Sequence, residues 1–413
     1  MSSRRTQATF SIAIIGHVDH GKSTLIGRLL YDNGSLSLDI VKGIEQSFNE
    51  SDRSAGFAYV TDHLEEERVN RKTIDTAQSS FKTDKRNYTI IDTPGHKEFI
   101  RNMITGASQA EAAILIVSAL EGMEEQTRRH AYFVSMLGIK QVILAVNKMD
   151  LVDFSESRFK ELKSMLSDFF GSLGMKPNNA IPISAMLGDN IVKTSENMRW
   201  YDGPTVFEAL DNLEGKEDLV EKPLRFPIQD VYICDQEKIL VGRVVSGKVK
   251  KGDEVLILPG ELRTRIESIE VYQATKDVAR AGESIGLVLH DDLELKRGEV
   301  ICHPQYPSEV ETTIDANIFW ISFDPLKIDN QLTIRCATAE ECCNIENIKE
   351  RINSSTLEII KDDTNILKET EVGRVTISIS RPMVFEDFNE TEGLGRFVLT
   401  RSGEICAGGI ITG

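Results

Sequence analysis

The sequence contains six cysteines but no Cys-x-x-Cys pair. Zinc sites commonly show such pairs, and disulfide frameworks belong to short secreted chains, so we expect neither in this protein. The chain also lacks any apolar run near the roughly 18 residues that a membrane helix requires, and its first residues lack the apolar segment of a secretory signal. We therefore expect a cytoplasmic protein with no membrane partner.

Basic residues are the minority among the charged ones. The 413 residues include 48 Lys and Arg against 65 Asp and Glu, which gives a formal net charge of −17. This balance excludes an overall electrostatic attraction to nucleic acid, although it allows local basic patches. With 40% hydrophobic and 27% charged residues, the chain has an ordinary globular composition and a length suited to roughly two to four domains.

A glycine-rich motif follows the apolar run at 10–15. Residues 16–24 read Gly-His-Val-Asp-His-Gly-Lys-Ser-Thr, a phosphate loop in the strand-to-helix context that the motif requires. The glycines allow successive backbone N–H groups to turn toward one anion, and the following helix adds the positive end of its dipole. Lys22 supplies a point charge for the outer phosphates, and Ser23 is placed to ligate Mg²⁺.

A second motif places a carboxylate at the end of a strand. The run 88–91 leads into Asp92-Thr93-Pro94-Gly95-His96. Because open α/β sheets bind ligands at the carboxyl ends of their strands, we expect Asp92 to hold Mg²⁺ through a water molecule. The backbone N–H of Gly95 is then placed to meet the γ-phosphate.

Two later motifs predict guanine as the base. The apolar run 142–146 leads into Asn147-Lys148-Met149-Asp150, in which the Asp150 carboxylate suits both N–H donors of the guanine edge. Adenine would leave this carboxylate unpaired, and sites built on such a bond reject the analogue that lacks it by roughly 10⁴ or more. Ser184-Ala185-Met186 follows another short apolar run and offers a backbone N–H to the guanine O6.

The hydrophobic pattern divides the chain into three predicted domains. Residues 1–221 alternate apolar strands with helical patterns, which is typical of a mainly parallel sheet covered by helices. One helix is expected where Phe159, Leu162, Leu166 and Phe169 recur. Residues 222–305 and 306–413 read as short strands with turn residues between them, so we expect two small β-barrels after an α/β phosphate-loop domain.

The motifs and their order resemble the translation-factor GTPase superfamily over essentially the whole chain. Residues 16–24 and 97–106 are most similar to elongation factor Tu and its archaeal and eukaryotic counterpart. Other stretches are more similar to the large, GTP-binding subunit of sulfate adenylyltransferase, and they are residues 22–32, 126–130, 252–260, 356–358 and 373–382. Because barrel surfaces carry the partner contacts, we expect the second branch.

The resemblance implies a GTP-binding and GTP-hydrolysing switch that cycles between GTP and GDP. In the sulfate branch, the chain couples GTP hydrolysis to adenylyl transfer from ATP to sulfate, which a separate small adenylyltransferase subunit performs. In the alternative branch, it is an elongation factor that delivers aminoacyl-tRNA to the ribosome. A kinase built on the phosphate loop alone would leave 147–150 and both barrels unexplained.

The resemblance also assigns roles to individual residues. Ser23 and Thr73 ligate Mg²⁺ when GTP is bound, and Asp92 acts through a water molecule. His96 orients the attacking water, so the predicted catalytic residues are His96, Lys22 and Thr73. The residues predicted to hold the nucleotide are Gly16, Asp19, His20, Gly21, Lys22, Ser23, Thr24, Gly95, Asn147, Lys148, Asp150, Ser184, Ala185 and Met186.

The first switch segment departs from the family pattern. Members carry Gly-Ile-Thr there, whereas this chain has Arg71 and Lys72 before Thr73. One hypothesis places Arg71 or Lys72 near the γ-phosphate, where a cation supplied in cis accelerates hydrolysis. The alternative is that both side chains point to solvent.

Overall fold

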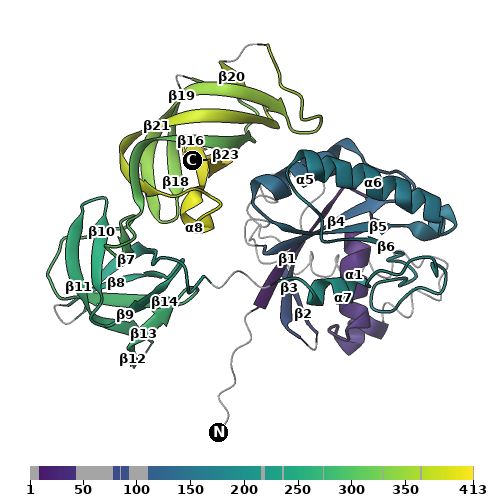
Figure 1. The fold of residues 1–413 in the computed structure, drawn as a ribbon, viewed down its shortest axis with the longest axis horizontal. Coiled ribbons are helices and arrows are strands. Elements are labelled where there is room, and N and C mark those ends of the chain that lie inside the picture. Colours follow the sequence, from purple (N-terminus) through teal and green to yellow (C-terminus); the bar gives the residue numbers. More distant parts are fainter. Residues whose placement is uncertain are drawn as a thin grey trace, which may run out of the picture. The chain divides into compact units, whose positions relative to one another are not determined.

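The computed structural model describes residues 9–42, 78–83, 85–92, 110–214, 219–234, 237–272, 274–328, 330–362 and 365–412. The chain divides into two compact units, Met1–Gly215 and Lys216–Gly413 (Figure 1). The predicted boundaries at 221 and 305 remain predictions. No helix in the described part of the chain is both long enough and apolar enough to cross a membrane.

The first unit is built on a six-stranded sheet with the order β2-β3-β1-β4-β5-β6. The strands are β1 (Thr9–Gly16), β2 (Gln78–Lys82), β3 (Asn87–Asp92), β4 (Ala112–Ser118), β5 (Gln141–Asn147) and β6 (Asn179–Pro182). All neighbouring pairs are parallel except β2 with β3. Every residue of β4 is buried, as expected for a strand covered on both faces.

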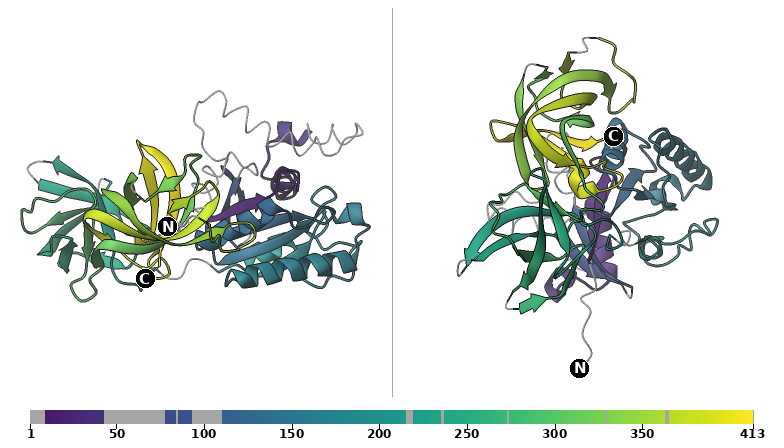
Figure 2. Two further views of the ribbon diagram at one scale, coloured as in Figure 1. Left: turned by 90° about the horizontal axis from the view of Figure 1, so that it is seen from above. Right: turned by 60° about the vertical axis from the view of Figure 1, so that its left-hand side comes forward.

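Helices cover the two faces of this sheet. They are α1 (Lys22–Asp32), α5 (Glu125–Met136), α6 (Glu156–Ser172) and α7 (Val206–Asp211), with a short 3₁₀ turn, η2 (Met149–Val152). Figure 2 shows α1 and α6 on opposite faces, in agreement with their separate clusters of buried side chains. On α6 the buried stripe ends at Phe170 rather than at the predicted Phe169, because Phe170 continues the helical repeat from Phe159.

The second unit contains two sets of β-strands. The first has strands β7 (Phe226–Cys234), β8 (Glu237–Arg243), β9 (Lys248–Lys250), β10 (Glu254–Leu258), β11 (Leu262–Val271), β12 (Ala274–Lys276), β13 (Val278–Arg280), β14 (Ser284–Leu289) and β15 (Val300–Cys302). Its seven-stranded sheet, ordered β10-β15-β7-β8-β14-β11-β12, curls back on itself because β10 also pairs with β11.

The second set forms a closed barrel with the order β16-β21-β19-β18-β22-β23. Its elements are β16 (Glu309–Trp320), β17 (Leu326–Lys327), β18 (Gln331–Cys336), β19 (Ala339–Asn353), β20 (Ile366–Leu367), β21 (Glu371–Phe385), α8 (Glu392–Gly395), β22 (Arg396–Arg401) and β23 (Glu404–Ile411). The predicted fold class, an α/β domain followed by two β-barrels, is therefore confirmed.

A buried ion pair joins the two barrels of the second unit. Arg225 precedes β7 and pairs with Glu386, which follows β21, and each side chain is only 7% exposed. The guanidinium of Arg225 also donates to the carbonyl oxygen of Tyr306 at 2.8 Å, and Ser308 Oγ donates to Glu386 at 2.8 Å. The charges are thus surrounded by hydrogen-bond partners, as a buried pair requires.

We expect Glu386→Ala to lower the unfolding free energy of the second unit by about 3–5 kcal/mol, because it leaves the buried Arg225 charge uncompensated. The control is Glu350→Ala, which breaks an exposed pair with Arg374 and should cost about 1 kcal/mol or less. Urea unfolding followed by Trp320 fluorescence in a Trp200→Phe background isolates the second unit, since these are the chain's two tryptophans. Equal losses in both variants would contradict the expectation.

Candidate nucleotide-binding site

The phosphate loop lies between β1 and α1, as predicted. Three of its residues adopt positive φ angles, 155° at Gly16, 63° at Asp19 and 95° at Gly21. The N–H of Leu25 donates to the carbonyl oxygen of Gly21 at 2.9 Å and so begins the helical ladder directly after the loop. The loop is therefore folded tightly over the amino end of α1, where the helix dipole favours an anion.

The ammonium group of Lys22 lies inside this loop. Its Nζ donates to the carbonyl oxygens of Gly16 at 2.8 Å and His17 at 2.9 Å. Burial lowers the pKa of Lys22 to about 8, while the charges of Asp92 and Asp19 act to raise it. The structure thus holds the charge of Lys22 at the point where the motif predicts phosphate.

Asn147, the last residue of β5, bridges two segments of the predicted site. Its Nδ2 donates to the carbonyl oxygen of His20 at 2.9 Å, and its Oδ1 accepts from the backbone N–H of Ala185 at 2.9 Å. The side chain is almost fully buried, with 3% of the residue exposed. A Cβ on Gly21 would overlap the Asn147 amide, so the glycine is required by this close approach as well as by its φ.

The segment after β6 contributes backbone rather than side chains. Ser184 and Ala185 are buried. Because the N–H of Ala185 is bonded to Asn147, it is not available for the predicted bond to a guanine O6. Among the described residues, the N–H of Met186 donates to no other group.

Lys148 and Asp150 lie on either side of a buried residue. Met149 is 0% exposed, and its N–H donates to the carbonyl oxygen of Ile183 at 3.2 Å. Lys148 adopts a φ of 62°, and η2 starts directly after it. Anchoring Met149 inside the core turns the two polar neighbours outward, where a base can reach them.

Glu121 is a residue of this site that the motifs do not include. Its carboxylate lies 3.1 Å from Lys148 Nζ and 3.4 Å from His20 Nε2. No motif flags this position, since an acidic residue in a loop after a strand is common. Only its place after β4, the strand beside β1 and β5, could have drawn attention to it.

The predicted magnesium and catalytic residues are only partly described. Asp92 ends β3 beside Ile14 of β1, and its charge acts on Lys22. Ser23 and Thr24 are partly buried in the first turn of α1. The remaining predicted residues lie outside the described part of the chain, and they are Arg71, Lys72, Thr73, Gly95 and His96.

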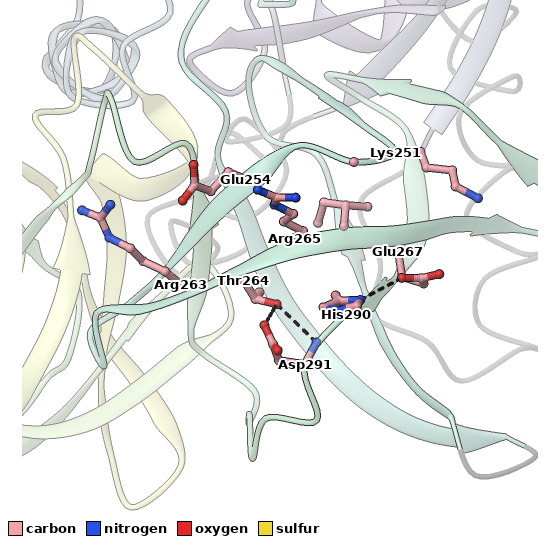
Figure 3. Close-up of a pocket in the computed structure, with 10 residues that line it drawn as sticks. Lys251, Glu254, Arg263, Thr264, Arg265, Glu267, His290 and Asp291 are labelled. Carbon is pink, nitrogen blue, oxygen red and sulfur yellow. Dashed lines mark hydrogen bonds and ion pairs between the residues drawn. The ribbon is translucent and has the colours of Figure 1, made fainter.

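A separate groove lies on the first barrel of the second unit (Figure 3). It has a volume of about 490 Å³ and carries charges of both signs. Glu254 is the direct cross-strand neighbour of Arg265, and His290 Nδ1 lies 3.3 Å from Glu267. This mixed lining lacks the glycine-rich backbone of a phosphate site. The loop after β1 is therefore the better candidate for the nucleotide site.

Comparison with known proteins places all three regions of the chain in one family. Residues 7–216 match the elongation factor Tu GTP binding domain, residues 238–302 match elongation factor Tu domain 2, and residues 313–412 match the GTP-eEF1A C-terminal domain-like family. Elongation factor 1-alpha of Methanopyrus kandleri is 42% identical over 97% of this chain and 96% of its own length.

The chain belongs to the elongation factor Tu/1-alpha family of GTPases. Two other archaeal relatives agree, since elongation factor 1-alpha of Ignicoccus hospitalis is 41% identical over 99% of this chain and 97% of its own length. The protein of that name from Saccharolobus solfataricus is 40% identical over 97% of this chain and 96% of its own length. Membership of this GTPase family supports the predicted binding of GTP and GDP and the predicted hydrolysis of GTP.

The expected similarity to the sulfate adenylyltransferase subunit was wrong. The similarity to elongation factor 1-alpha extends along nearly the whole chain, barrels included, and leaves no support for sulfate activation or a small adenylyltransferase partner. The segments behind the expectation are parts of the scaffold. Residues 22–32 are α1, which buries Leu25 and Leu29, and 252–260 contain β10, which buries Val255 and Ile257. Such positions are constrained by packing and say little about partners.

Two buried histidines in this GTP-binding unit are held neutral. Burial lowers the pKa of His20 to about 4, and burial together with the charge of Lys22 lowers that of His130 to about 3. His130 is 2% exposed and lies on α5, within the influence of His17 and Arg129. Protonating either ring inside the unit is therefore costly.

We expect the unfolding free energy of the first unit to fall as the pH drops from about 6.5 toward 4. The unfolded chain protonates both histidines near their usual pKa of 6.5, whereas the folded unit does so only near 4 and 3. Each histidine then costs about 1.4 kcal/mol per pH unit. Urea unfolding followed by Trp200 fluorescence in a Trp320→Phe background measures this slope. His130→Asn should reduce the slope by that amount, and an unchanged slope would disprove the assignment.

Gly21→Ala should weaken GDP binding at least tenfold, because the added Cβ displaces the Asn147 amide that holds the loop. Gly34→Ala is the matched control. It also has a positive φ, 69°, and carries the same backbone cost of about 1–2 kcal/mol, but its Cβ would enter open space. Calorimetric titration with GDP should show Gly34→Ala within twofold of the unchanged chain. Similar losses in both variants would mean that backbone strain alone is responsible.

Proposed function

We propose that this chain is a translation elongation factor that binds GTP with Mg²⁺, carries aminoacyl-tRNA to the ribosome and hydrolyses GTP there. The observation that carries the proposal is the 42% identity to an elongation factor 1-alpha over 97% of the chain. The matches to a GTP binding domain, to elongation factor Tu domain 2 and to the GTP-eEF1A C-terminal domain-like family, in this order along the chain, support it.

Base recognition is assigned to the segments that Asn147 joins. The Asp150 carboxylate accepts from the two N–H donors of the guanine edge, and the Met186 N–H donates to O6. Lys148 lies beside them at the end of β5. Adenine would leave the carboxylate without donors, which supports selection of guanine by roughly 10⁴ or more.

Phosphate binding is assigned to the loop after β1. Lys22 Nζ is already directed into the loop by two carbonyl oxygens, and it supplies charge to the outer phosphates. The backbone N–H groups from Asp19 to Thr24 lie over the start of α1 and complete the anion site. Gly16 permits the close approach of the loop to the backbone of Ile116.

The residues present fit a magnesium ion. Ser23 in the phosphate loop offers a hydroxyl, and Asp92 at the end of β3 offers a carboxylate that acts through a water molecule. Oxygen donors of this kind are those that Mg²⁺ prefers. Thr73 is the third proposed ligand. When bound, the ion neutralises charge on the phosphates. Hydrolysis is assigned to a water molecule that His96 orients, with Lys22 stabilising the developing charge.

Binding of tRNA by this chain cannot depend on its overall charge, which is −17. Recognition then comes from local contacts, and the number of phosphates that they neutralise sets how steeply the affinity depends on salt. The ion pair of Arg225 with Glu386 holds the two barrels of the second unit together as a common platform for such contacts.

A base-swap experiment tests this function. In a filter-binding assay, we expect the protein with GTP to retain at least tenfold more aminoacyl-tRNA than the protein with GDP. Deacylated tRNA should not be retained. In Asp150→Asn the side-chain amide suits the 2-oxo group of xanthine, so xanthosine triphosphate should replace GTP as the nucleotide that supports binding. Guanine-dependent GTP binding without any retention of aminoacyl-tRNA would overturn the elongation function while leaving the GTPase assignment intact.

A further inference from the structure

We propose that Glu121 is a positioning residue for guanine nucleotides, because its carboxylate holds Lys148 of the base side at a place next to His20 of the phosphate loop. It acts through Lys148 and sets the position of that side chain before a nucleotide enters. This inference rests on the guanine-nucleotide binding proposed above. Glu121 lies outside the four sequence motifs that predict that binding.

The loop that carries Glu121 is fixed by the scaffold. The N–H of Ala119 donates to the carbonyl oxygen of Asn147 at 2.7 Å, and the N–H of Gly122 donates to that of Ser118 at 2.8 Å. From α6, Arg158 Nε donates to the carbonyl oxygen of Ala119 at 2.8 Å. The position of Glu121 is therefore determined by β4, β5 and α6 rather than by a ligand.

The two carboxylate oxygens of Glu121 divide between two partners. Oε1 accepts from Lys148 Nζ at 3.1 Å, and Oε2 lies 3.4 Å from His20 Nε2. Burial acts to raise the pKa of Glu121, but the hydrogen bond and charge of Lys148 outweigh it, so the pKa is lowered. The carboxylate is thus ionised at neutral pH and holds Lys148 beside the phosphate loop.

Holding Lys148 in advance has a thermodynamic consequence. A free lysine side chain loses about 1.5–2 kcal/mol of rotamer entropy when it is fixed. Glu121 restrains Lys148 in the free protein, so less of this cost falls on nucleotide binding. The Asn147 amide, next to Lys148 in the chain, already fixes the backbone of the phosphate loop at His20, so Glu121 orients the Lys148 side chain on a frame that Asn147 has set.

The pair contributes little to the stability of the fold. The side chain of Glu121 is 36% exposed and that of Lys148 is 26% exposed, and ion pairs at such positions typically add about 1 kcal/mol or less. If Glu121→Gln changes the activation free energy of nucleotide release by more than it changes the free energy of unfolding, Glu121 has a positioning role. Both GDP and GTP should be affected equally, because they share the base that Lys148 faces.

A double-mutant cycle on the full chain tests the proposal. Dissociation rates of fluorescent GDP and of a non-hydrolysable fluorescent GTP analogue are measured for Glu121→Gln, Lys148→Met and the double variant. We expect Glu121→Gln to speed the release of both nucleotides three- to tenfold, and to change it less than twofold in the Lys148→Met background. Glu121→Asp, which keeps the charge, should restore part of the difference.

Glu124→Gln is the matched control. Glu124 precedes α5, makes no capping hydrogen bond and should leave both rates within twofold. Unchanged release in Glu121→Gln, or an equally large acceleration in the Lys148→Met background, would overturn the role of Glu121. Failure of the unchanged chain to bind GDP would instead overturn the guanine-nucleotide function itself.

Discussion

The side-chain amide of Asn147 is the contact on which the nucleotide site depends. It donates to the phosphate loop at His20 and accepts from the segment after β6 at Ala185. Because Asn147 ends a strand that is buried in the sheet, both loops are positioned from the core of the unit. Gly21 has no side chain where this amide passes, and this absence allows the loop to close.

Two short segments of this chain show how a local resemblance can mislead. Segments such as 22–32 and 252–260 suggested a partner in sulfate activation, whereas similarity over nearly the whole chain places the protein with elongation factor 1-alpha. These segments form a core helix and a barrel strand. Their buried residues are constrained by packing in the core. Partner choice depends on exposed surface, which core positions do not report.

Much of the fold was predictable because it follows from local pattern. Apolar runs predicted β1 and β5 as strands of a mainly parallel sheet, and the alternation after residue 222 predicted the barrels. The ion pair of Arg225 with Glu386 was not predictable, since these residues are 161 positions apart and neither belongs to a motif. The hydrogen bond from the N–H of Ala185 to the side chain of Asn147 was not predictable either, since the two residues are 38 positions apart.

The sequence by itself determined the class of ligand, because the spacing of glycine, lysine and acidic residues behind their strands is a local property that carries the chemistry with it. The tertiary structure alone decided which groups touch. His20 and Asn147 are 127 positions apart, and Glu121 and Lys148 are 27 apart, so they meet only after the parallel strands have assembled. Long-range contacts of this kind depend on the packing of the whole unit, which no short stretch of residues encodes.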